Sequence, residues 1–535
     1  MPTPGRAEFV EIVRRARGEP HAAPIVCVPV VVTLLADHLT PVVAYRRLVA
    51  PDQRDAPSFL LESVEGGERQ GRYSILGARP RTTFLAREGH VRVEPPDPAL
   101  ATPTAAPAPE PADPFALLRA FARARRLVRT PGAPACFLGG LVGYAAYDSV
   151  RYSEPDKLPF ARAPRDDRTL PDVDFAYYDG VVIFDHVAKC VHVVELAEVA
   201  PTTDPAAAYD AALARLRERL ALLDRHSEPL RAAELPPAAP PTPLAGGMSR
   251  EAHAAMLARA FEYIRAGDIF QVVLGQRFER VSPADPFDVY RALRTVNPSP
   301  YMVYLQARGC ILVASSPEIL CRVEADPATG RSLVTNRPLA GTRRRGRTIA
   351  EDQALERDLL ADPKERAEHI MLVDLGRNDV GRVAEPGTIA LPRVMDIERY
   401  SHVMHISSTV TGVLRDGLDC WDALAAALPV GTISGAPKVR AMQIIDELEP
   451  IRRGPYGGGL GCVGLDGQMD IALTLRTIVA PLNARTHDGW TYHLQASGGI
   501  VADSDPAAEY QETVNKAAAL ARAIDVAEHA TRHRA

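Results

Sequence analysis

Two proline- and alanine-rich stretches interrupt this chain of 535 residues. Residues 95–114 and 227–247 hold prolines too densely for an α-helix or an inner β-strand, because proline lacks a backbone N–H and fixes φ. We expect both stretches to be solvated connectors. Strand-like segments resume after the first stretch, which predicts a surface loop within one domain. The second predicts a linker between a domain over residues 1–226 and another over residues 248–535.

Periodicity along the chain predicts a mixture of strands and helices. Short β-rich runs dominate before the linker, with a helical pattern at about residues 206–223. After the linker, Ser249 can cap a helix that ends at Gly267 and has apolar residues at helical spacing, namely Met256, Leu257, Phe261 and Ile264. Hairpin-like strand pairs outnumber βαβ patterns. We therefore predict an α+β fold, with large antiparallel or mixed β-sheets covered by helices in two closely associated domains.

The composition is that of a globular protein with no bias towards nucleic acid. Charged residues make up 24% of the chain and hydrophobic residues 46%, and the net charge is −5. A nucleic-acid-binding protein usually carries a basic stripe, and basic residues cluster here mainly at residues 343–345. We expect no nucleic-acid partner.

The cysteines and the N-terminal region indicate a reducing, aqueous compartment. The seven cysteines are scattered and form no C-x-x-C pair, which suits neither a disulfide framework nor a zinc site. The apolar run over residues 25–35 is about half as long as a membrane span and contains Pro29, so we expect a buried strand. The first residues lack the charged-then-apolar order of a signal peptide. These features predict a cytoplasmic protein without a membrane partner.

Two acidic segments carry carboxylates at helical spacing. Glu365 and Glu368 lie three residues apart in one segment, and Glu509 and Glu512 lie three apart in the other. Mg²⁺ typically takes one or two protein carboxylates and completes its shell with water and an anionic substrate. Spacing alone leaves two alternatives open, a magnesium site and a pair of solvated charged helix faces.

Glycine-rich turns gather in the last two hundred residues, at residues 340–346, 431–438, 454–461 and 495–501. None has the pattern of a phosphate-binding nucleotide loop. They are consistent with tight turns that need positive φ, and also with backbone amides lining an anion site. Arg476 lies in an apolar strand-like run, where it can pair with a structural carboxylate or with the carboxylate of a substrate.

Seven blocks of the chain resemble the chorismate-utilising enzymes, and within that family the similarity is to the large subunits of anthranilate synthases. In chain order these blocks are SSPEIL, PLAGTRRRG, KERAEHIMLVDLGRNDVGRV, YSHVMHISSTVTG, GTISGAPKVRAMQIIDELE, GPYGGGLG and DSDPAAEYQETVNKA. The resemblance covers essentially all of residues 248–525, and LLESVEGGERQGRYSILG and FLGGLVGYAAYD extend it to the first domain. The resemblance implies an enzyme that converts chorismate and ammonia to anthranilate and pyruvate in tryptophan biosynthesis.

The resemblance also implies roles for individual residues. Mg²⁺ would be held by Glu368 and Glu512, and Glu365 and Glu509 would either support these ligands or reach the ion through water. Glu318 would protonate the departing hydroxyl, and His405 would serve the elimination of pyruvate. The substrate contacts implied by the resemblance are Gly341, Thr342, Tyr456, Arg476, Ser497, Gly498 and Gly499. The segment QASGGIV departs from the AGAG that is common in the family, which bears on Ser497.

Two positions distinguish the branches of the family. Ala340 stands where aminodeoxychorismate synthases carry a nucleophilic lysine, and Gln271 stands where isochorismate and salicylate synthases carry a lysine that activates water. Neither residue can perform those steps, whereas ammonia needs no such base. We expect Gln271 to belong to the catalytic site. The alternatives are an aminodeoxychorismate or aminodeoxyisochorismate synthase and a non-catalytic chorismate-binding protein.

The resemblance further implies a partner and an inhibitor. The chain has no block like the cysteine nucleophile of a glutaminase, so ammonia would come from a glutamine amidotransferase subunit. LLES and NPSPYM match the tryptophan-feedback site of anthranilate synthases, which assigns L-tryptophan to Ser63, Pro300, Tyr301 and Met302. The alternative is that both segments are structural turns.

Overall fold

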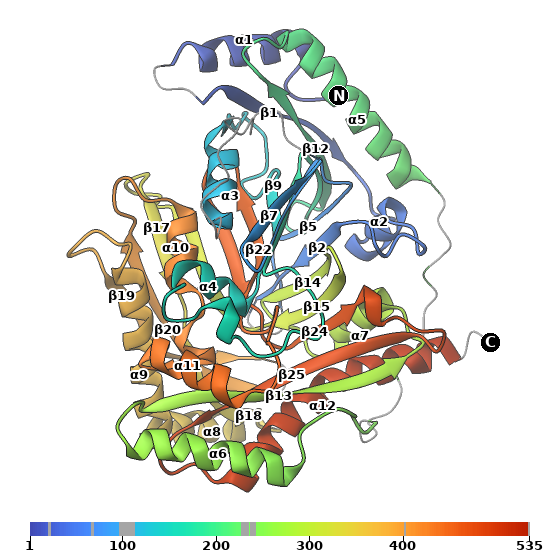
Figure 1. Cartoon of the computed structure of the whole chain (residues 1–535). Helices are drawn as coiled ribbons and strands as arrows, with labels where there is room; N and C mark the ends of the chain where they lie inside the picture. Colours follow the sequence, from blue (N-terminus) through green and yellow to red (C-terminus); the bar gives the residue numbers. More distant parts are fainter. Residues whose placement is uncertain are drawn as a thin grey trace.

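The computed structural model describes residues 1–19, 23–65, 69–95, 113–225, 230, 235, 242–400 and 403–532. Most of the two predicted connectors, at 95–114 and 227–247, lies outside the described residues. Within the described part of the chain, two large β-sheets are surrounded by helices (Figure 1). Their strands pair antiparallel, except for the parallel pair of β1 and β8. The predicted α+β fold with antiparallel or mixed sheets is confirmed.

Sheet 1 is the larger of the two and contains 12 strands among the described residues. In spatial order they are β21 (Gly435–Ala436), β13 (Gln271–Ser282), β25 (Trp490–Ile500), β24 (Thr477–Pro481), β15 (Cys310–Ser316), β14 (Tyr301–Gln306), β2 (Ser58–Glu62), β5 (Tyr73–Ala78), β11 (Gly180–Asp185), β12 (Cys190–Val199), β1 (Ile25–Leu34) and β8 (Arg125–Leu127).

Sheet 2 contains 11 strands among the described residues. Its path runs through β18 (Leu339–Arg344), β20 (Val403–Val413), β17 (Ser332–Asn336), β16 (Ile319–Ala325), β23 (Met469–Leu473), β22 (Gly459–Gly464), β9 (Gly140–Ala145), β10 (Val173–Tyr178), β6 (Thr82–Arg87) and β7 (His90–Glu94), while β19 (Ala390–Arg399) pairs with β20. A separate ribbon consists of β3 (Val64–Glu65) and β4 (Arg69–Gln70).

Each large sheet contains strands from both sides of the predicted linker. In sheet 1, β2 pairs with β14, and in sheet 2, β9 pairs with β22. Gly143 and Gly461 are register partners at the second junction. A Cβ at Gly143 would lie 1.9 Å from the Asp174 carbonyl oxygen, and one at Gly461 would lie 2.1 Å from that of Asp470. Side chains larger than hydrogen therefore do not fit at this junction.

The two sheets enclose an apolar core between their facing surfaces. Phe59 of sheet 1 meets Tyr178 of sheet 2 edge-to-face, with their ring centroids 4.7 Å apart. Leu312 of sheet 1 and Leu460 of sheet 2 belong to the same buried cluster. Burial of such large side chains is the main favourable term that holds one sheet against the other.

Helices cover the outer faces of the sheets. Near the N-terminus, α1 (Arg6–Arg17), α2 (Pro41–Leu48) and α5 (Pro205–Asp224) pack on sheet 1 (Figure 1). At the opposite end of sheet 1 lie α6 (Arg250–Arg265), α7 (Pro286–Val296), α11 (Lys438–Leu448) and α12 (Pro506–Arg532). Sheet 2 contacts α3 (Pro114–Arg123), α8 (Ile349–Ala361), α9 (Pro363–Gly381) and α10 (Cys420–Ala427), and the short α4 (Val150–Ser153) follows β9.

The structure confirms the helices predicted from periodicity. Ser249 accepts a hydrogen bond from the Ala252 backbone amide at 3.1 Å and so caps α6. The pattern at 206–223 forms α5, and residues 25–34 form the buried strand β1. The apolar stripe of α12, which includes Leu520 and Ile524, is buried against the sheet.

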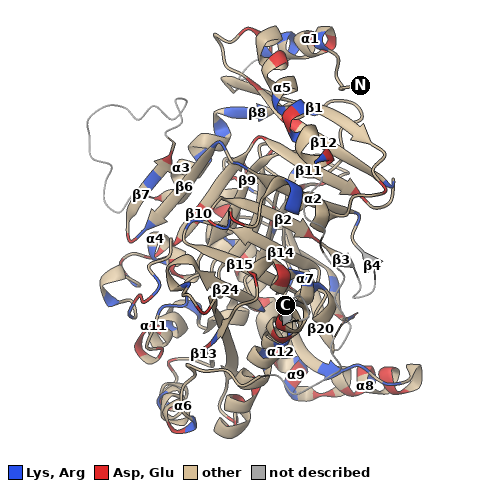
Figure 2. Ribbon diagram, turned by 90° about the vertical axis from the view of Figure 1, so that its right-hand side faces the viewer, with Lys and Arg blue, Asp and Glu red and all other residues tan. Residues whose placement is uncertain are grey.

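Charged side chains of both signs are interspersed along the surface helices, as α5 and α8 show in Figure 2. Many of them pair, for example Arg344 with Glu351 at 2.6 Å. Among the described residues, no helix combines the length and the apolar character that a membrane crossing requires.

An ion pair between a buried arginine and a half-buried aspartate joins the segments on either side of the linker and yields the first prediction. Arg54 is 4% exposed and donates two hydrogen bonds to Asp285, at 2.9 and 3.0 Å. We expect Arg54→Ala to lower the free energy of unfolding by about 3 kcal/mol, because it leaves a carboxylate without its partner. Chemical denaturation followed by circular dichroism measures this change.

The exposed pair of Arg6 and Asp210 provides the control. Their side chains are 57% and 54% exposed, and the ion pair measures 2.9 Å. Arg6→Ala should leave the free energy of unfolding close to that of the parent, since water screens such pairs. Equal effects of the two substitutions would contradict the structural role of Arg54.

Candidate active site

The candidate site lies where the chain crosses from one sheet to the other. Pro317 and Glu318 connect β15 of sheet 1 to β16 of sheet 2, and residues 474–476 connect β23 of sheet 2 to β24 of sheet 1. The two crossings are hydrogen-bonded to each other, from the Leu473 amide to the Glu318 carbonyl at 3.0 Å and from the Ser315 amide to the Arg476 carbonyl at 3.1 Å. This arrangement brings Glu318 and Arg476 together from distant parts of the sequence.

Glu318 is buried in a way that favours its neutral form. Its side chain is 3% exposed, and burial raises the pKa of its carboxyl to about 8. The Thr432 hydroxyl donates a hydrogen bond to Glu318 Oε1 at 3.1 Å, and Arg476 also stabilises the charged form. Burial outweighs both. A carboxyl group that stays protonated near neutral pH can act as a general acid.

Arg476 supplies a cation in the same region. Its φ is +45°, a left-handed conformation that is uncommon for a residue with a side chain. Burial lowers the pKa of its guanidinium, while Tyr400 and Glu318 favour the charged form. Nη2 lies 3.3 Å from His405 Nε2. A guanidinium that has no bidentate carboxylate partner among the described residues can bind the carboxylate of a ligand.

The hydrogen bonds of His405 define its neutral tautomer. Nδ1 lies 3.0 Å from the Gly341 carbonyl oxygen, which can only accept, so Nδ1 carries the proton. Nε2 then accepts from Arg476, in agreement with the 3.3 Å separation. Burial and the Arg476 charge lower the pKa of His405 to about 4. His405 therefore presents a neutral ring at physiological pH.

A bulge between β18 and β20 positions these contacts. The register shifts between Ala340 and Thr342, and Gly341 between them has a φ of +67°. Such bulges re-aim backbone groups, and here the Gly341 carbonyl is directed at His405. The Thr342 hydroxyl lies 3.1 Å from the same Nδ1 atom. The bulge thus explains why a glycine stands in this motif.

Strand β25 brings the last glycine-rich segment, at residues 495–501, beside the carboxylates. A Cβ at Gly498 would lie 2.7 Å from Glu509 Oε2, and one at Gly499 would lie 2.5 Å from Gln271 Nε2 and 3.6 Å from Glu368 Oε1. Only the small glycines allow these polar side chains to approach the strand. Ser497, which precedes them, lies with its Oγ 2.6 Å from the Tyr456 hydroxyl, and burial raises the pKa of Tyr456 to about 12.

The acidic residues of α9 and α12 face the same strand. Burial raises the pKa of Glu368, and the nearby Glu365 and Glu512 raise it further. Burial and Glu512 likewise raise the pKa of Glu509. Carboxylates raise one another's pKa when they crowd together without a cation. The convergence of the two helices, expected from the sequence as one alternative, is present in the structure.

These residues fit a magnesium ion by their donor chemistry. Their carboxylates offer hard oxygen ligands beside a strand whose glycines leave space. Within the described ranges, no group of three acidic, histidine or cysteine side chains lies close enough together to form a metal cluster. Mg²⁺ needs only one or two protein carboxylates, so an open pair suffices. Glu512 is half exposed and pairs with Lys516 at 2.6 Å.

Gln271 lies beside Glu368, and only the nitrogen of its side-chain amide is hydrogen-bonded among the described residues. It is 2% exposed, and its Nε2 donates to Glu368 Oε1 at 3.3 Å. Its Oε1 has no hydrogen-bond partner among the described residues. A buried acceptor of this kind is available to a donor that enters the site.

Three site residues were not assigned from the sequence. Lys516 donates to the Ser497 carbonyl oxygen at 2.9 Å, Thr432 bonds to Glu318, and the Tyr400 ring lies 5.6 Å from that of His405. Each lies within a motif quoted above. The partners of Lys516 and Thr432 come from other motifs, whereas Tyr400 and His405 share one. Spacing within one segment carries no signal of such contacts.

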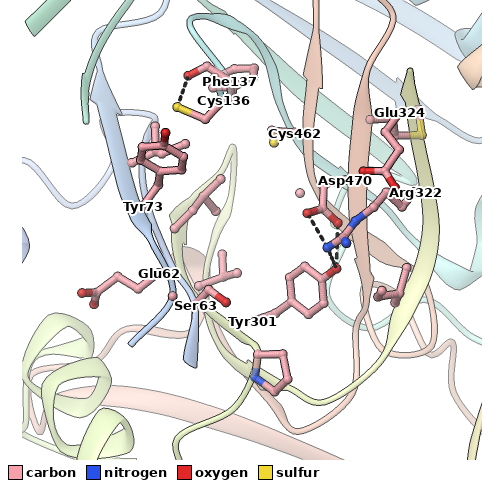
Figure 3. A pocket seen from close by; sticks show the side chains of 18 of the residues that line it. Glu62, Ser63, Tyr73, Cys136, Phe137, Tyr301, Arg322, Glu324, Cys462 and Asp470 are labelled. Atoms are coloured by element: carbon pink, nitrogen blue, oxygen red, sulfur yellow. Dashed lines mark hydrogen bonds and ion pairs between the residues drawn. The ribbon is translucent and has the colours of Figure 1, made fainter. Parts of the chain in front are cut away.

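Three of the four residues that the resemblance assigns to tryptophan border a cavity of about 970 Å³ between the two sheets. Ser63, Pro300 and Tyr301 line it (Figure 3). The Tyr301 hydroxyl donates to Asp470 at 2.7 Å. Met302 pairs with Glu62 across β14 and β2, and its side chain is buried on the opposite face of sheet 1, against the helices. Strand alternation thus excludes the Met302 side chain from the cavity.

Comparison with known proteins places this geometry in a family. Residues 57–522 match the family model described as chorismate binding enzyme. The chain belongs to this family. A family in which chorismate is bound agrees with a site that combines Arg476 with a neutral, buried Glu318.

The relatives of this chorismate-binding chain include plant and bacterial proteins. It is 53% identical over 517 residues to anthranilate synthase alpha subunit 1, chloroplastic, of Oryza sativa subsp. indica, covering 92% of this chain and 87% of the relative. It is 47% identical over 501 residues to anthranilate synthase component 1 of Thermus thermophilus, covering 93% and 97%. The crystal structure of anthranilate synthase component I from Streptococcus pneumoniae superposes with a TM-score of 0.68 at 33% identity, covering 91% of this chain and 98% of that one.

The neutral His405 yields the second prediction. We expect its ring to stay neutral, with the proton on Nδ1, down to about pH 4, because burial and Arg476 oppose the imidazolium. Because the pKa of His405 is lowered in the folded state, only the unfolded protein takes up this proton as the pH falls from 6.5 towards 4. The free energy of unfolding therefore decreases over that range, and the contribution of His405 to stability is lost. Nitrogen-15 NMR, assigned with His405→Gln, measures the tautomer. A ring that charges near pH 6.5 would refute the assignment.

Proposed function

We propose that this chain is the large subunit of an anthranilate synthase, which converts chorismate and ammonia to anthranilate, pyruvate and water. The observation that carries the proposal is the buried Glu318, with a pKa of about 8, beside Arg476 and the neutral His405. This arrangement combines an acid for a leaving hydroxyl with a cation for a carboxylate. The names of the relatives support the same activity.

The chemistry assigns a task to each of these groups. Ammonia forms a bond to ring carbon C2, and the C4 hydroxyl leaves as water after taking the proton of Glu318. Loss of the enolpyruvyl group as pyruvate, with removal of the C2 proton, then gives the aromatic ring. His405 is placed to assist this elimination because its ring is neutral and lies against the substrate-binding Arg476. Arg476, Tyr456, Ser497 and the backbone at residues 341–342 and 498–499 orient the substrate.

Mg²⁺ is the proposed cofactor, held by Glu368 and Glu512. When bound, it would act as a Lewis acid and a template for the ring carboxylate. Glu365 and Glu509 would act through water, and Glu365 is already paired with Arg343 at 3.1 Å. Glu512 raises the pKa of both Glu368 and Glu509, which supports this placement because a bound cation would relieve that repulsion.

The nucleophile is proposed to be ammonia rather than water. Gln271 cannot deprotonate water, but its free Oε1 can accept an N–H of ammonia and leave the nitrogen lone pair available. Ala340 excludes the lysine adduct of aminodeoxychorismate synthases. The ammonia would come from a glutamine amidotransferase subunit, which fits the designation of the relatives as component 1 or alpha subunit. A cytoplasmic location is part of the proposal, although the rice relative is named chloroplastic.

We also propose that L-tryptophan inhibits the enzyme by binding in the cavity between the sheets. Ser63 directly follows β2, and Tyr301 begins the neighbouring strand β14, so the two residues come from opposite sides of the linker. A ligand that binds one arrangement of these strands better than another shifts the population of the active form. The apolar rings of Tyr73, Phe137 and Tyr301 at the cavity wall suit an indole.

The third prediction tests the activity. Purified alone, the chain should form anthranilate and pyruvate from chorismate, Mg²⁺ and ammonium, and it should not use glutamine. The rate should rise with pH, because only uncharged NH₃ carries the nucleophilic lone pair. Fluorescence and mass of the product distinguish anthranilate from aminodeoxychorismate. Absence of anthranilate, or glutamine use by the isolated chain, would contradict the proposal.

Within this assay, Glu368→Gln should lower kcat/KM at limiting Mg²⁺ by at least about tenfold, because a charged ligand is lost. The matched control is Asp374→Asn, which removes a carboxylate from the exposed face of the same helix α9. Calorimetric Mg²⁺ titration should show weaker binding for the Glu368 variant and parent-like binding for the control. Parent-like values for both variants would remove Glu368 from the metal site.

The fourth prediction concerns inhibition. Ser63→Leu should raise the tryptophan concentration for half-inhibition by about tenfold, because a bulky side chain fills part of the cavity. Turnover without tryptophan should stay close to that of the parent. Ser332→Leu, at the exposed end of β17, is the control. Anthranilate formation measured against tryptophan concentration tests this, and a parent enzyme insensitive to tryptophan would overturn the regulatory proposal.

A further inference from the structure

The glycine-rich segment at residues 430–438, here called the 430–438 turn, has no assigned role in the chemistry above. It connects α10 to α11 and contains a 3₁₀ turn, Gly431–Ile433, followed by strand β21. The sequence left open whether it is a tight turn or an anion site. In the structure, one of its side chains, Thr432, contacts the candidate acid.

The Thr432 side chain points to Glu318, whereas the residues on either side of it are buried in the core. Gly431 and Ile433 are buried, whereas Thr432 is half-buried, and its Oγ1 lies 3.1 Å from Glu318 Oε1. The other groups that act on this carboxyl are the Leu339 backbone amide, Arg476 and Glu398. Within the described chain, Thr432 supplies the side-chain hydrogen bond to the Glu318 carboxyl.

The 430–438 turn is fixed from several sides. Arg453 is 2% exposed and donates to the Ile433 carbonyl oxygen at 2.6 Å. The Val273 amide donates to the Ser434 carbonyl oxygen at 2.9 Å, and β21 pairs with the start of β13. A Cβ at Gly431 would lie 2.4 Å from Leu375 Cδ1, so α9 packs directly on the turn.

A buried ion pair completes these contacts. Lys438 donates to Asp379 of α9 at 2.6 Å, and the two side chains are 9% and 1% exposed. The turn is thus connected to α9, which carries Glu368, and to β13, which begins at Gln271. Because these anchors are buried, they hold Thr432 in one place relative to the other site residues.

We propose that Thr432 is a positioning residue for Glu318, and that the buried contacts of the 430–438 turn hold Thr432 in place. The inference rests on the proposed function, in which Glu318 is the acid. A neutral carboxyl carries its proton on one oxygen. Because the Thr432 hydroxyl donates to Oε1, the proton of Glu318 belongs on Oε2, and from there it can pass to the departing hydroxyl of the substrate.

The sign of the pH effect follows from the direction of this hydrogen bond. A donor to Oε1 favours the ionised carboxylate, so Thr432 lowers the pKa of Glu318 from the value that burial alone would give, and the net result is about 8. Removing the hydroxyl raises that pKa. Protonated Glu318 then persists to higher pH, while the orientation of its carboxyl is lost.

The fifth prediction compares Thr432→Val with Thr432→Ser. At a fixed concentration of free NH₃, Thr432→Val should lower kcat about five- to tenfold and move the alkaline limb of the pH profile upwards by about 0.5 to 1 pH unit, the equivalent of one hydrogen bond. Thr432→Ser retains the hydroxyl and should restore the position of the limb. A Thr432→Val enzyme with the parent's limb and kcat overturns the proposal.

A second measurement separates this inference from the activity itself. Infrared difference spectra of the substrate-free protein report the carbonyl band of the protonated carboxyl, with Glu318→Gln as the blank. The band should persist to higher pH in Thr432→Val than in the parent or Thr432→Ser. Coincident titrations in all three overturn the role of Thr432 even in an active enzyme. A shifted titration in a protein that forms no anthranilate upholds the contact and rejects the proposed function instead.

Discussion

Backbone pairing across the two halves of the chain is the constraint on which the rest of the structure depends. Strands β2 and β14, and strands β9 and β22, join segments that are far apart in sequence into two continuous sheets. Gly143 and Gly461 make the second junction sterically possible. Because the sheets are continuous, the chain crosses between them at fixed points. Glu318, the proposed acid, and the cation Arg476 lie at two of those crossings.

Burial then sets the charge state of each group at the crossings. It raises the pKa of Glu318 to about 8 and lowers that of His405 to about 4, so both side chains are neutral at physiological pH. Arg476 keeps its charge because a guanidinium is far more basic than either group. The outcome is that the Arg476 cation lies beside two neutral groups, Glu318 and His405. Such a site attracts a carboxylate and offers a proton to a leaving group.

The active site and the cavity between the sheets share a wall. Pro317 and Tyr400 both line the cavity, while Pro317 precedes Glu318 and the Tyr400 ring lies 5.6 Å from that of His405. Tyr400 donates to Glu398, another cavity residue, at 2.7 Å. A ligand in the cavity can therefore contact Pro317, the neighbour of Glu318 in the chain, and Tyr400, whose ring lies beside that of His405. Because of this proximity, tryptophan bound in the cavity would act on the proposed catalytic groups through directly neighbouring residues.

The sequence by itself determined the local elements and the residue types of the site. Helical periodicity and the Ser249 cap defined α6, alternating strand-like runs gave the α+β class, and motif resemblance gave the family, because all of these depend on residues close together in the chain. Only the tertiary structure decided which motifs meet. The bond of Thr432 to Glu318, the tautomer of His405, and the orientation of Met302 away from the cavity depend on strand register and on contacts between distant segments. Burial is likewise a property of the assembled fold, so the charge states that the chemistry requires cannot be obtained from spacing alone.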